Sequence, residues 1–111
     1  MTVTSAAAAP VTTAAAPAAT AAPVIIRLSG DLDIGARPLI RRALSAAQGG
    51  ARAHIIVDLA DVTFLDAAGF GVLVAARGYA IMAGGSLTVR SPSYAARRIM
   101  DLFPRDLPVA G

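Results

Sequence analysis

The pattern of apolar and polar positions from residue 24 onward predicts first a strand and then an amphipathic helix. Val24–Leu28 is rich in β-branched residues and meets the turn signal Ser29-Gly30, which is typical of a strand and its end. Pro38 suits the first turn of a helix, and Gly49-Gly50 suits its end. Between them, the apolar residues that share one helical face are Ile40, Ala43, Leu44 and Ala47.

A second strand is predicted over His54–Leu59, which contains the run Ile55-Ile56-Val57. A nearly continuous apolar strand after a crossover helix indicates parallel pairing in a sheet that is covered on both faces. We interpret Asp61–Phe64 as a short connection to the next helix.

A long apolar helix is predicted after this connection. Asp66 is a good N-cap for a helix from Ala67 to about Ala83, and Gly84-Gly85 suits its end. The helix is apolar on nearly all sides, so it either lies centrally or keeps one face for a partner. Its apolar residues include Phe70, Val72, Leu73, Val74, Ala75, Ala76, Ile81 and Met82.

The last part of the chain predicts one more strand and one more helix. Ser86–Arg90 alternates as a strand does, Ser91-Pro92 opens the helix and Pro104 ends it. We expect Ile99, Met100 and Phe103 to point inward, Arg97 and Arg98 to point outward, and residues 107–110 to add a short strand. The order β-α-β-α-β-α predicts an α/β domain with a small, mostly parallel sheet and about three helices.

Residues 1–23 differ from the rest because they are almost all Ala, Pro, Thr and Val. This composition supplies little apolar bulk, so we expect a disordered tether before a single domain at residues 24–111. Three prolines interrupt the segment and no basic residue opens it, which argues against a signal peptide. No apolar stretch reaches membrane-spanning length, so we expect a cytoplasmic protein without membrane insertion.

The composition removes several classes of function. The chain has no Cys and a single His, His54, so thiolate metal sites, His clusters and a Ser-His-Asp triad are excluded. We expect no metal and no cofactor. The net charge is +3, but the ten Arg residues are scattered, whereas a nucleic-acid surface needs a denser basic stripe. We therefore expect no nucleic-acid partner.

The candidate chemistry for an enzyme is incomplete. Gly69-Phe70-Gly71 lacks the third glycine and the acidic residue of a dinucleotide-binding motif. Five carboxylates could suggest acid–base catalysis or a magnesium site, but no nucleophile or partner His accompanies them. Local roles explain three of them, since Asp58 ends a strand, Asp61 lies in a turn and Asp66 caps a helix. The five are Asp31, Asp33, Asp58, Asp61 and Asp66. We expect that the protein is not an enzyme.

The turn at Asp66 has its own physical interest. A strand–loop–helix turn presents free backbone N–H groups at the helix start, where a negative charge or a phosphorylated side chain is favoured. A regulatory phosphate at such a turn would change the charge beside the helix face.

Three motifs resemble the STAS family, the domain of bacterial anti-sigma factor antagonists. Leu28–Asp33, read LSGDLD, is similar to the family pattern l-x-G-e-l-D. Ile56–Leu73, read IVDLADVTFLDAAGFGVL, resembles i-v-l-D-l-s-x-v-x-f-i-D-S-S-G-l-g-v-L. Gly84–Leu87 followed by Ser91-Pro92 resembles the later strand and helix start. The resemblance covers Val24 to about Phe103.

The resemblance implies a mixed sheet of four or five strands and a regulatory switch. In this family the unphosphorylated antagonist binds a kinase-type anti-sigma factor and frees the sigma factor, and phosphorylation of the second Ser of D-S-S-G ends the binding. Here Ala68 occupies the phosphoacceptor position and Ala67 precedes it, so neither accepts phosphate. Thr63 lies nearby but does not align with the acceptor. The family's usual last helix is missing, so we expect a STAS domain truncated at its C-terminal helix.

The resemblance therefore favours an anti-sigma factor antagonist without the usual serine switch, with an anti-sigma factor of the serine kinase type as partner. The implied partner-binding residues are Asp31, Asp33, Asp66, Ala67, Ala68, Gly69 and Phe70. The alternative is a STAS scaffold subunit of a stressosome-like complex or of a lipid-transport ABC ATPase. An enzyme or nucleotide binder is a third hypothesis, against which the chain offers no phosphate-binding loop.

Overall fold

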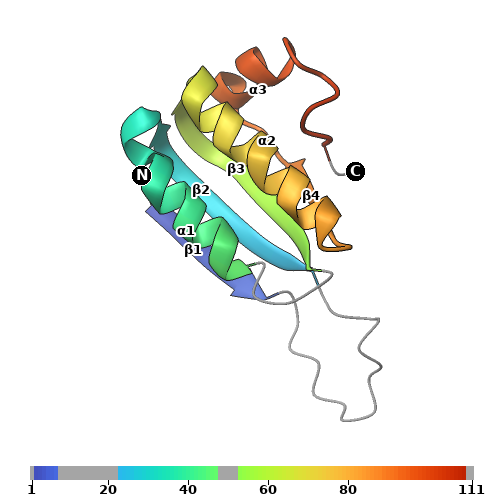
Figure 1. Ribbon diagram of the computed structural model, residues 1–111. Helices are drawn as coiled ribbons and strands as arrows, with labels where there is room; N and C mark the ends of the chain where they lie inside the picture. Colours follow the sequence, from blue (N-terminus) through green and yellow to red (C-terminus); the bar gives the residue numbers. More distant parts are fainter. Residues whose placement is uncertain (1, 8–22, 48–52, 110–111) are drawn as a thin grey trace.

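In the part of the chain that the structure describes, one four-stranded sheet is accompanied by three α-helices (Figure 1). The computed structural model describes residues 2–7, 23–47 and 53–109. In chain order the elements are β1 (Thr2–Ala7), β2 (Val24–Leu32), a 3-10 turn η2 (Ile34–Ala36), α1 (Arg37–Ala47), β3 (His54–Leu65), α2 (Ala67–Met82), β4 (Ser86–Arg90) and α3 (Tyr94–Met100). The α/β class, the sheet and the three helices confirm the predicted fold, while the end of α1 at Gly49-Gly50 lies outside the described residues.

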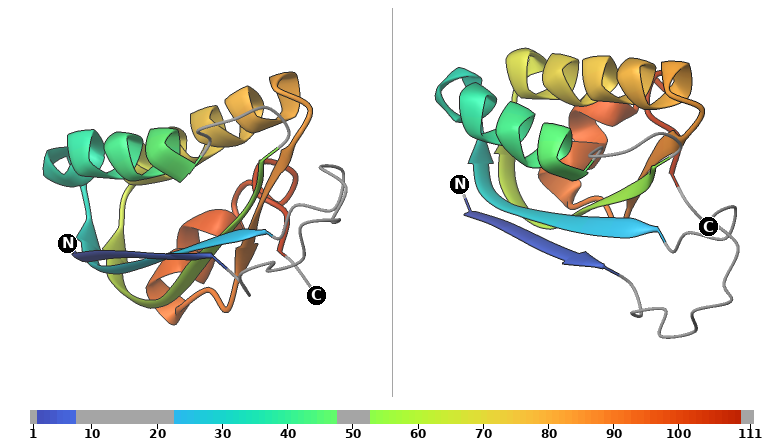
Figure 2. Two further views of the ribbon diagram at one scale, coloured as in Figure 1. Left: turned by 90° about the horizontal axis from the view of Figure 1, so that it is seen from below. Right: turned by 60° about the horizontal axis from the view of Figure 1, so that its bottom comes forward.

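The strands lie side by side in the order β1-β2-β3-β4. β2, β3 and β4 are mutually parallel, as predicted, and β1 pairs antiparallel with β2. α1 and α2 lie next to each other over one face of the sheet (Figure 2), because each is the crossover between two adjacent parallel strands. α3 packs beside β3, where the Ser93 N–H donates to the Leu59 carbonyl at 3.1 Å.

The core fills the space between the sheet and the helices. The largest fully buried side chains are Ile26, Leu28, Leu32, Ile40, Leu44, Ile55, Val57, Leu59, Leu73, Leu87 and Val89. Ile40 and Leu44 are the two buried residues of the amphipathic face that the sequence predicts for α1. At about 25 cal/mol per Å² of apolar surface removed from water, this cluster is the main source of stability.

β2 and β3 both run further than the sequence predicts. β2 continues through Ser29-Gly30 to Leu32, with register shifts around Ser29 and Gly30, and Gly30 has a φ of 84° that favours glycine. The added length pairs Asp31 with Phe64 and Leu32 with Leu65. The interpretation of Asp61–Phe64 as a short connection was therefore wrong, because this segment has a neighbouring strand that satisfies its backbone.

The expectation that all of residues 1–23 are disordered is wrong for Thr2–Ala7. This segment pairs with β2 from Thr2 opposite Ser29 to Ala7 opposite Val24. Thr2, Val3 and Thr4 are β-branched and suit an edge strand, although the alanines around them provide little apolar bulk. Residues 8–22 lie outside the described part of the chain.

The sequence left open whether α2 lies centrally or keeps one face for a partner, and the structure shows one buried face and one exposed face. Its inner face belongs to the core, with Leu73 fully buried and Val72, Ala76 and Ala80 nearly so. Its outer face is exposed, with small residues such as Gly71 and Ala75 towards the start of the helix and the large side chains of Tyr79, Ile81 and Met82 towards its end. The helix is thus central on one side and open on the other, and its N-cap at Asp66 is as predicted.

The C-terminal region differs in detail from its prediction. α3 is capped by Ser93, whose Oγ accepts the Ala96 N–H at 3.1 Å, whereas Ser91 has a left-handed φ of 49° and precedes the cap. The helix ends at Met100, before Pro104. The strand predicted at residues 107–110 is present as a single parallel bridge between Val89 and Val109.

Candidate functional site

The candidate site lies at the edge of the sheet where β2 and β3 end and α2 begins. The Asp66 N–H donates to the Leu32 carbonyl at 3.4 Å, which joins the end of β2 to the start of α2. Gly69 is buried against the same carbonyl, and a Cβ on Gly69 would lie 2.3 Å from the Leu32 oxygen. A glycine at this position therefore allows the helix start to sit directly on the strand end.

Two carboxylates of the site cap the elements that follow them. An Asp66 Oδ1 accepts the Gly69 N–H at 2.8 Å, and an Asp33 Oδ1 accepts the Ala36 N–H at 3.2 Å. The Gly69 N–H would otherwise lack a partner at the start of α2, whereas the Ala36 N–H also donates to the Asp33 carbonyl at 3.0 Å. The positive end of the α2 dipole also favours an acidic residue at this position.

The third carboxylate joins the two strands at their ends. Asp31 is exposed, and its Oδ1 accepts the Thr63 hydroxyl at 2.8 Å. The predicted set Asp31, Asp33 and Asp66 is thus brought to one edge of the sheet. Thr63 lies near the turn, and its hydroxyl already donates to the Asp31 carboxylate. A phosphate on Thr63 would therefore lie beside a negative charge.

The alanine pair at the start of α2 is accessible. Ala67 is exposed and Ala68 is half-buried, in the first turn after the cap. Neither side chain carries a hydroxyl, so the turn has no acceptor for phosphate at these two positions. The exposed surface at this turn is formed by the methyl groups of these two alanines, and the capping carboxylates lie beside it.

Phe70 does not contribute surface to the site, which corrects its assignment as an apolar partner contact. Its side chain is only 5 % exposed and belongs to the core cluster, with its ring centroid 5.4 Å from that of Phe103. Gly69 is buried as well. The exposed apolar side chains nearest in sequence to the site are instead Ile34, at 65 %, and Phe64, at 48 %.

Neither Ile34 nor Phe64 was predicted from the sequence as a site residue. Strict alternation from buried Val62 would place Phe64 on the inner face, but Thr63 and Phe64 are both exposed between buried Val62 and Leu65, so the periodicity of the strand gave no signal for Phe64.

Asp58 belongs to a separate, structural cluster in the middle of the sheet. It is 6 % exposed, and it accepts the Arg90 Nε–H at 2.9 Å and the Ala60 N–H at 2.9 Å, with Arg27 Nε at 3.7 Å. Burial raises the pKa of Asp58, but the Ala60 N–H and the two guanidinium groups outweigh it and hold the pKa below its ordinary value. Asp58 therefore lies within β3, and the interpretation that it ends a strand was wrong.

Other predicted features occupy ordinary structural positions. His54 is exposed at the start of β3, where its Nδ1 lies 2.8 Å from the Ser86 Oγ on β4. Within residues 2–7, 23–47 and 53–109, no three His, Asp or Glu side chains gather as a metal site would require. In that same part of the chain, none of the helices has the length and apolar character needed to cross a membrane.

Comparison with known proteins places this geometry in a family. The family model described as "Mlab, STAS domain" matches residues 15–106. SpoIIAA, an anti-sigma factor antagonist, is similar in its unphosphorylated form with a TM-score of 0.66 and 26 % identity over 80 % of both chains. The Bacillus cell fate determinant SpoIIAA in its phosphorylated form gives a TM-score of 0.60 and 27 % identity, over 80 % of this chain and 83 % of that one.

A third structure shares the fold alone. It is a candidate anti-sigma factor antagonist from Thermotoga maritima, with a TM-score of 0.64 and 22 % identity over 77 % of each chain. The match of the family model extends over most of the 111 residues, and the resemblance seen in the sequence motifs is confirmed. The chain belongs to the STAS domain family.

Proposed function

We propose that this chain is an anti-sigma factor antagonist that binds a kinase-type anti-sigma factor and so releases a sigma factor, without a serine phosphorylation switch. Its family and its likeness to SpoIIAA support a regulatory role. The observation that carries the finer proposal is the alanine pair, exposed Ala67 and half-buried Ala68, at the first turn of α2.

The charge of the turn explains why these alanines matter. A phosphate would add a charge of about −1.5 to −2 at neutral pH, beside the carboxylates of Asp33 and Asp66. With alanine at position 68 the charge of the turn stays constant, and the hydrogen bond from Gly69 to Asp66 holds its shape. The docking surface is therefore permanently in the form that lacks phosphate.

The same contacts argue against a catalytic role for the site. Asp33 and Asp66 direct carboxylate oxygens at backbone N–H groups, and Asp31 accepts the Thr63 hydroxyl. Each carboxylate thus has a structural partner within the turn. We propose that they hold and charge a binding surface and that no reaction takes place there.

The substitution Ala68→Asp tests the proposal by adding a permanent negative charge. We expect affinity for a kinase-type anti-sigma factor from the same genome, measured by titration calorimetry, to fall by about 100-fold, or about 2.7 kcal/mol. The fold should survive, because an acidic residue in the first turn of a helix is favourable. The matched control is Ala46→Asp at an exposed position of α1, which should change the affinity less than about twofold.

Unchanged affinity in the folded Ala68→Asp variant would place the contact elsewhere. No binding of the wild-type chain to any kinase-type anti-sigma factor of its genome would remove the function itself. Binding to the ATPase subunit of a lipid transporter, or assembly into a large scaffold, would establish the alternative role instead.

The substitution Ala68→Ser tests whether only the acceptor differs from the family pattern. With ATP and the anti-sigma factor, mass spectrometry should detect phosphate on residue 68, and the complex should dissociate. If binding persists with no phosphate transferred, the partner is not a serine kinase acting at this turn.

A further inference from the structure

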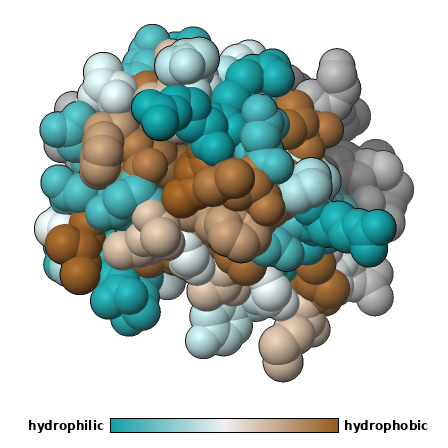
Figure 3. Space-filling view, turned by 90° about the horizontal axis from the view of Figure 1, so that it is seen from above, coloured by the Kyte–Doolittle hydropathy of each residue, from teal (hydrophilic) through white to brown (hydrophobic). Residues whose placement is uncertain are grey.

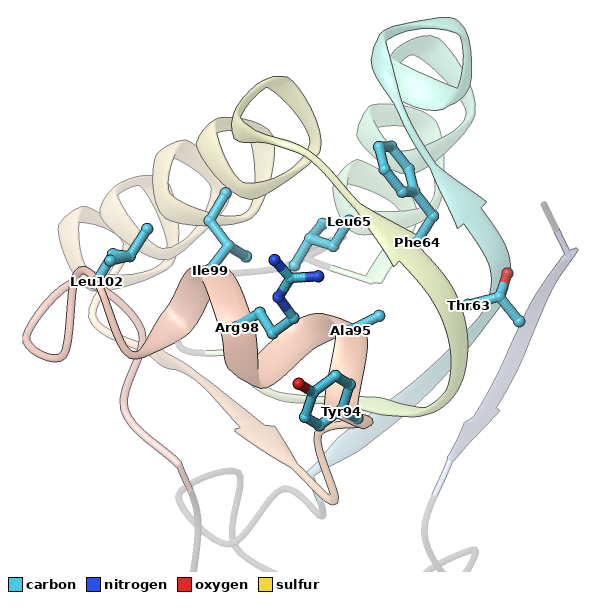
Figure 4. Close-up of a pocket in the computed structure, with 8 residues that line it drawn as sticks. All are labelled: Thr63, Phe64, Leu65, Tyr94, Ala95, Arg98, Ile99 and Leu102. Carbon is cyan, nitrogen blue, oxygen red and sulfur yellow. The ribbon is translucent and has the colours of Figure 1, made fainter.

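A groove with apolar walls runs between the end of β3 and α3, next to the candidate site. Its volume is about 450 Å³. Figure 4 shows it with Arg98 reaching from α3 into the space that faces the end of β3. It is lined by Thr63, Phe64, Leu65, Tyr94, Ala95, Arg98, Ile99 and Leu102. We refer to these eight residues as the α3 groove.

The composition of the α3 groove is that of a protein-binding surface. Phe64, Tyr94 and Leu102 leave 48 %, 80 % and 71 % of their surface exposed, which places three large apolar side chains around one groove. Aromatic residues and Arg are enriched where protein interfaces bind most tightly, and acidic residues are depleted there. No acidic residue lines this groove. Figure 3 shows apolar surface gathered in the middle of the molecular end at which α2 begins.

Arg98 indicates the charge of the occupant. Among the described residues, Arg27 and Arg90 share the carboxylate of Asp58 and the other Arg residues have no ion pair; of these, Arg98 is the one that lines the groove. A guanidinium among apolar walls favours a carboxylate, with which it can form a bidentate hydrogen bond. Residues 1–23 contain no Asp or Glu, so the chain's own N-terminal segment cannot supply this group.

The α3 groove is continuous with the site proposed for the anti-sigma factor. Thr63 lines the groove and donates its hydroxyl to Asp31, and Leu65 lines it directly before the cap Asp66. A protein that docked on the turn at Asp66 would therefore have the groove beside it. Its near end is walled by Phe64, and its far end by Leu102.

We propose that the α3 groove binds a segment of the anti-sigma factor that carries one large apolar side chain and a nearby carboxylate. The apolar side chain packs among Phe64, Leu65 and Ile99, and the carboxylate pairs with Arg98. This inference rests on the proposed function and names the second contact that the partner makes. It also gives the complex a contact that the charge at position 68 does not control.

The substitution Arg98→Gln tests the proposal with little risk to the fold, because Arg98 is exposed. We expect the full-length chain to lose about tenfold in affinity for the anti-sigma factor, or about 1.4 kcal/mol. The matched control is Arg97→Gln, the adjacent exposed Arg that does not line the groove, and it should change affinity less than about twofold. The difference between the two variants should shrink in about 0.5 M salt.

A second variant, Tyr94→Ala, removes an exposed aromatic wall and should also weaken binding by about tenfold. Equal losses in Arg97→Gln and Arg98→Gln would overturn the proposal, since they would indicate a general effect of charge. A wild-type dimer in sedimentation experiments that Arg98→Gln dissociates would also overturn it, because the occupant would then be a second copy of this chain.

The two proposals fail in different ways. If Ala68→Asp abolishes binding while Arg98→Gln and Tyr94→Ala bind as tightly as the wild type, the α3 groove is wrong and the proposed function stands. If the groove variants weaken binding while Ala68→Asp does not, the groove stands and the turn at Asp66 is not the contact.

Discussion

The carboxylates of this small domain occupy two contrasting regions. In the middle of the sheet Asp58 is buried, with the guanidinium groups of Arg27 and Arg90 and one backbone N–H around it. At the edge of the sheet Asp31, Asp33 and Asp66 accept hydrogen bonds only from a hydroxyl or from backbone N–H groups, among the described residues. The buried carboxylate is neutralised within the fold, whereas the edge keeps its negative charge facing outward.

Among the described residues, the buried carboxylate has partners of opposite charge, whereas the three carboxylates at the edge of the sheet have none. The Ala60 N–H and the guanidinium groups of Arg90 and Arg27 favour the ionised form of Asp58 and together outweigh the cost of desolvating a charge. Asp33 and Asp66 are half-buried, and their partners are the backbone N–H groups of helical turns. We therefore propose that Asp58 serves stability and that the edge carboxylates serve recognition.

The largest expected effect is at the buried member of the comparison. Asp58→Ala should destabilise the protein by about 3 kcal/mol in urea unfolding, because the Ala60 N–H and the Arg90 guanidinium lose their shared acceptor. The affinity of the folded variant for the anti-sigma factor should be unchanged. A loss of less than about 1 kcal/mol would show that solvent replaces the cluster, and the distinction between the regions would weaken.

The next largest effect is expected at the contact between Gly69 and the Leu32 carbonyl, which positions the start of α2 on the end of β2. Gly69→Ala places a Cβ 2.3 Å from the Leu32 carbonyl oxygen, so the start of α2 must move, at about 2 kcal/mol of stability. Gly71→Ala is the matched control, since a Cβ there meets nothing within 4 Å and should stabilise the helix by about 1 kcal/mol. Equal stabilities for the two variants in thermal unfolding would contradict the close packing described here.

A smaller effect distinguishes the role of Asp66 as a helix cap from its proposed role in recognition. Asp66→Ala should cost about 1 kcal/mol, because the Gly69 N–H loses its cap. Asp66→Asn keeps an acceptor for that N–H and should cost only a few tenths, but it removes the charge that we assign to recognition. If Asp66→Asn binds the anti-sigma factor as tightly as the wild type, the carboxylate serves the fold alone.

The smallest expected effect is a dependence on acid pH. Because the folded pKa of Asp58 lies below its ordinary value of 3.8, its ionised form stabilises the protein fully above about pH 5. This contribution is lost as the pH falls through 3.8 towards the folded pKa. The difference in unfolding free energy between wild type and Asp58→Ala should therefore narrow below about pH 4. A difference that stays constant down to pH 3 would show that the charge of Asp58 contributes nothing.

Local signals predicted the elements best. The cap at Asp66, the apolar α2, the strand Ser86–Arg90 and the amphipathic face of α1 depend on neighbours in sequence, and all are present. The family resemblance predicted that Asp31, Asp33 and Asp66 belong to one site. The parallel pairing of β2 with β3, with Leu32 opposite Leu65, places these three residues at the same edge of the sheet.

Contacts between distant residues explain the errors. Asp58 and Arg90 are 32 residues apart and meet because β3 and β4 pair, so no local pattern shows their cluster. Phe70 is buried within the core cluster, and one of its contacts is with Phe103, which lies beyond α3. The length of β3 depends on its register with β2 across the irregularity near Gly30, which sequence alone does not fix.

The most direct test of the account maps the bound surface itself. Backbone amide shifts of the isotope-labelled chain, followed by nuclear magnetic resonance during titration with the anti-sigma factor, should change most at residues 31–34 and 66–68. The amides of Arg27, Asp58 and Arg90 should change least. Shifts centred on those three residues in the middle of the sheet, with residues 66–68 unaffected, would contradict the assignment of the edge to recognition.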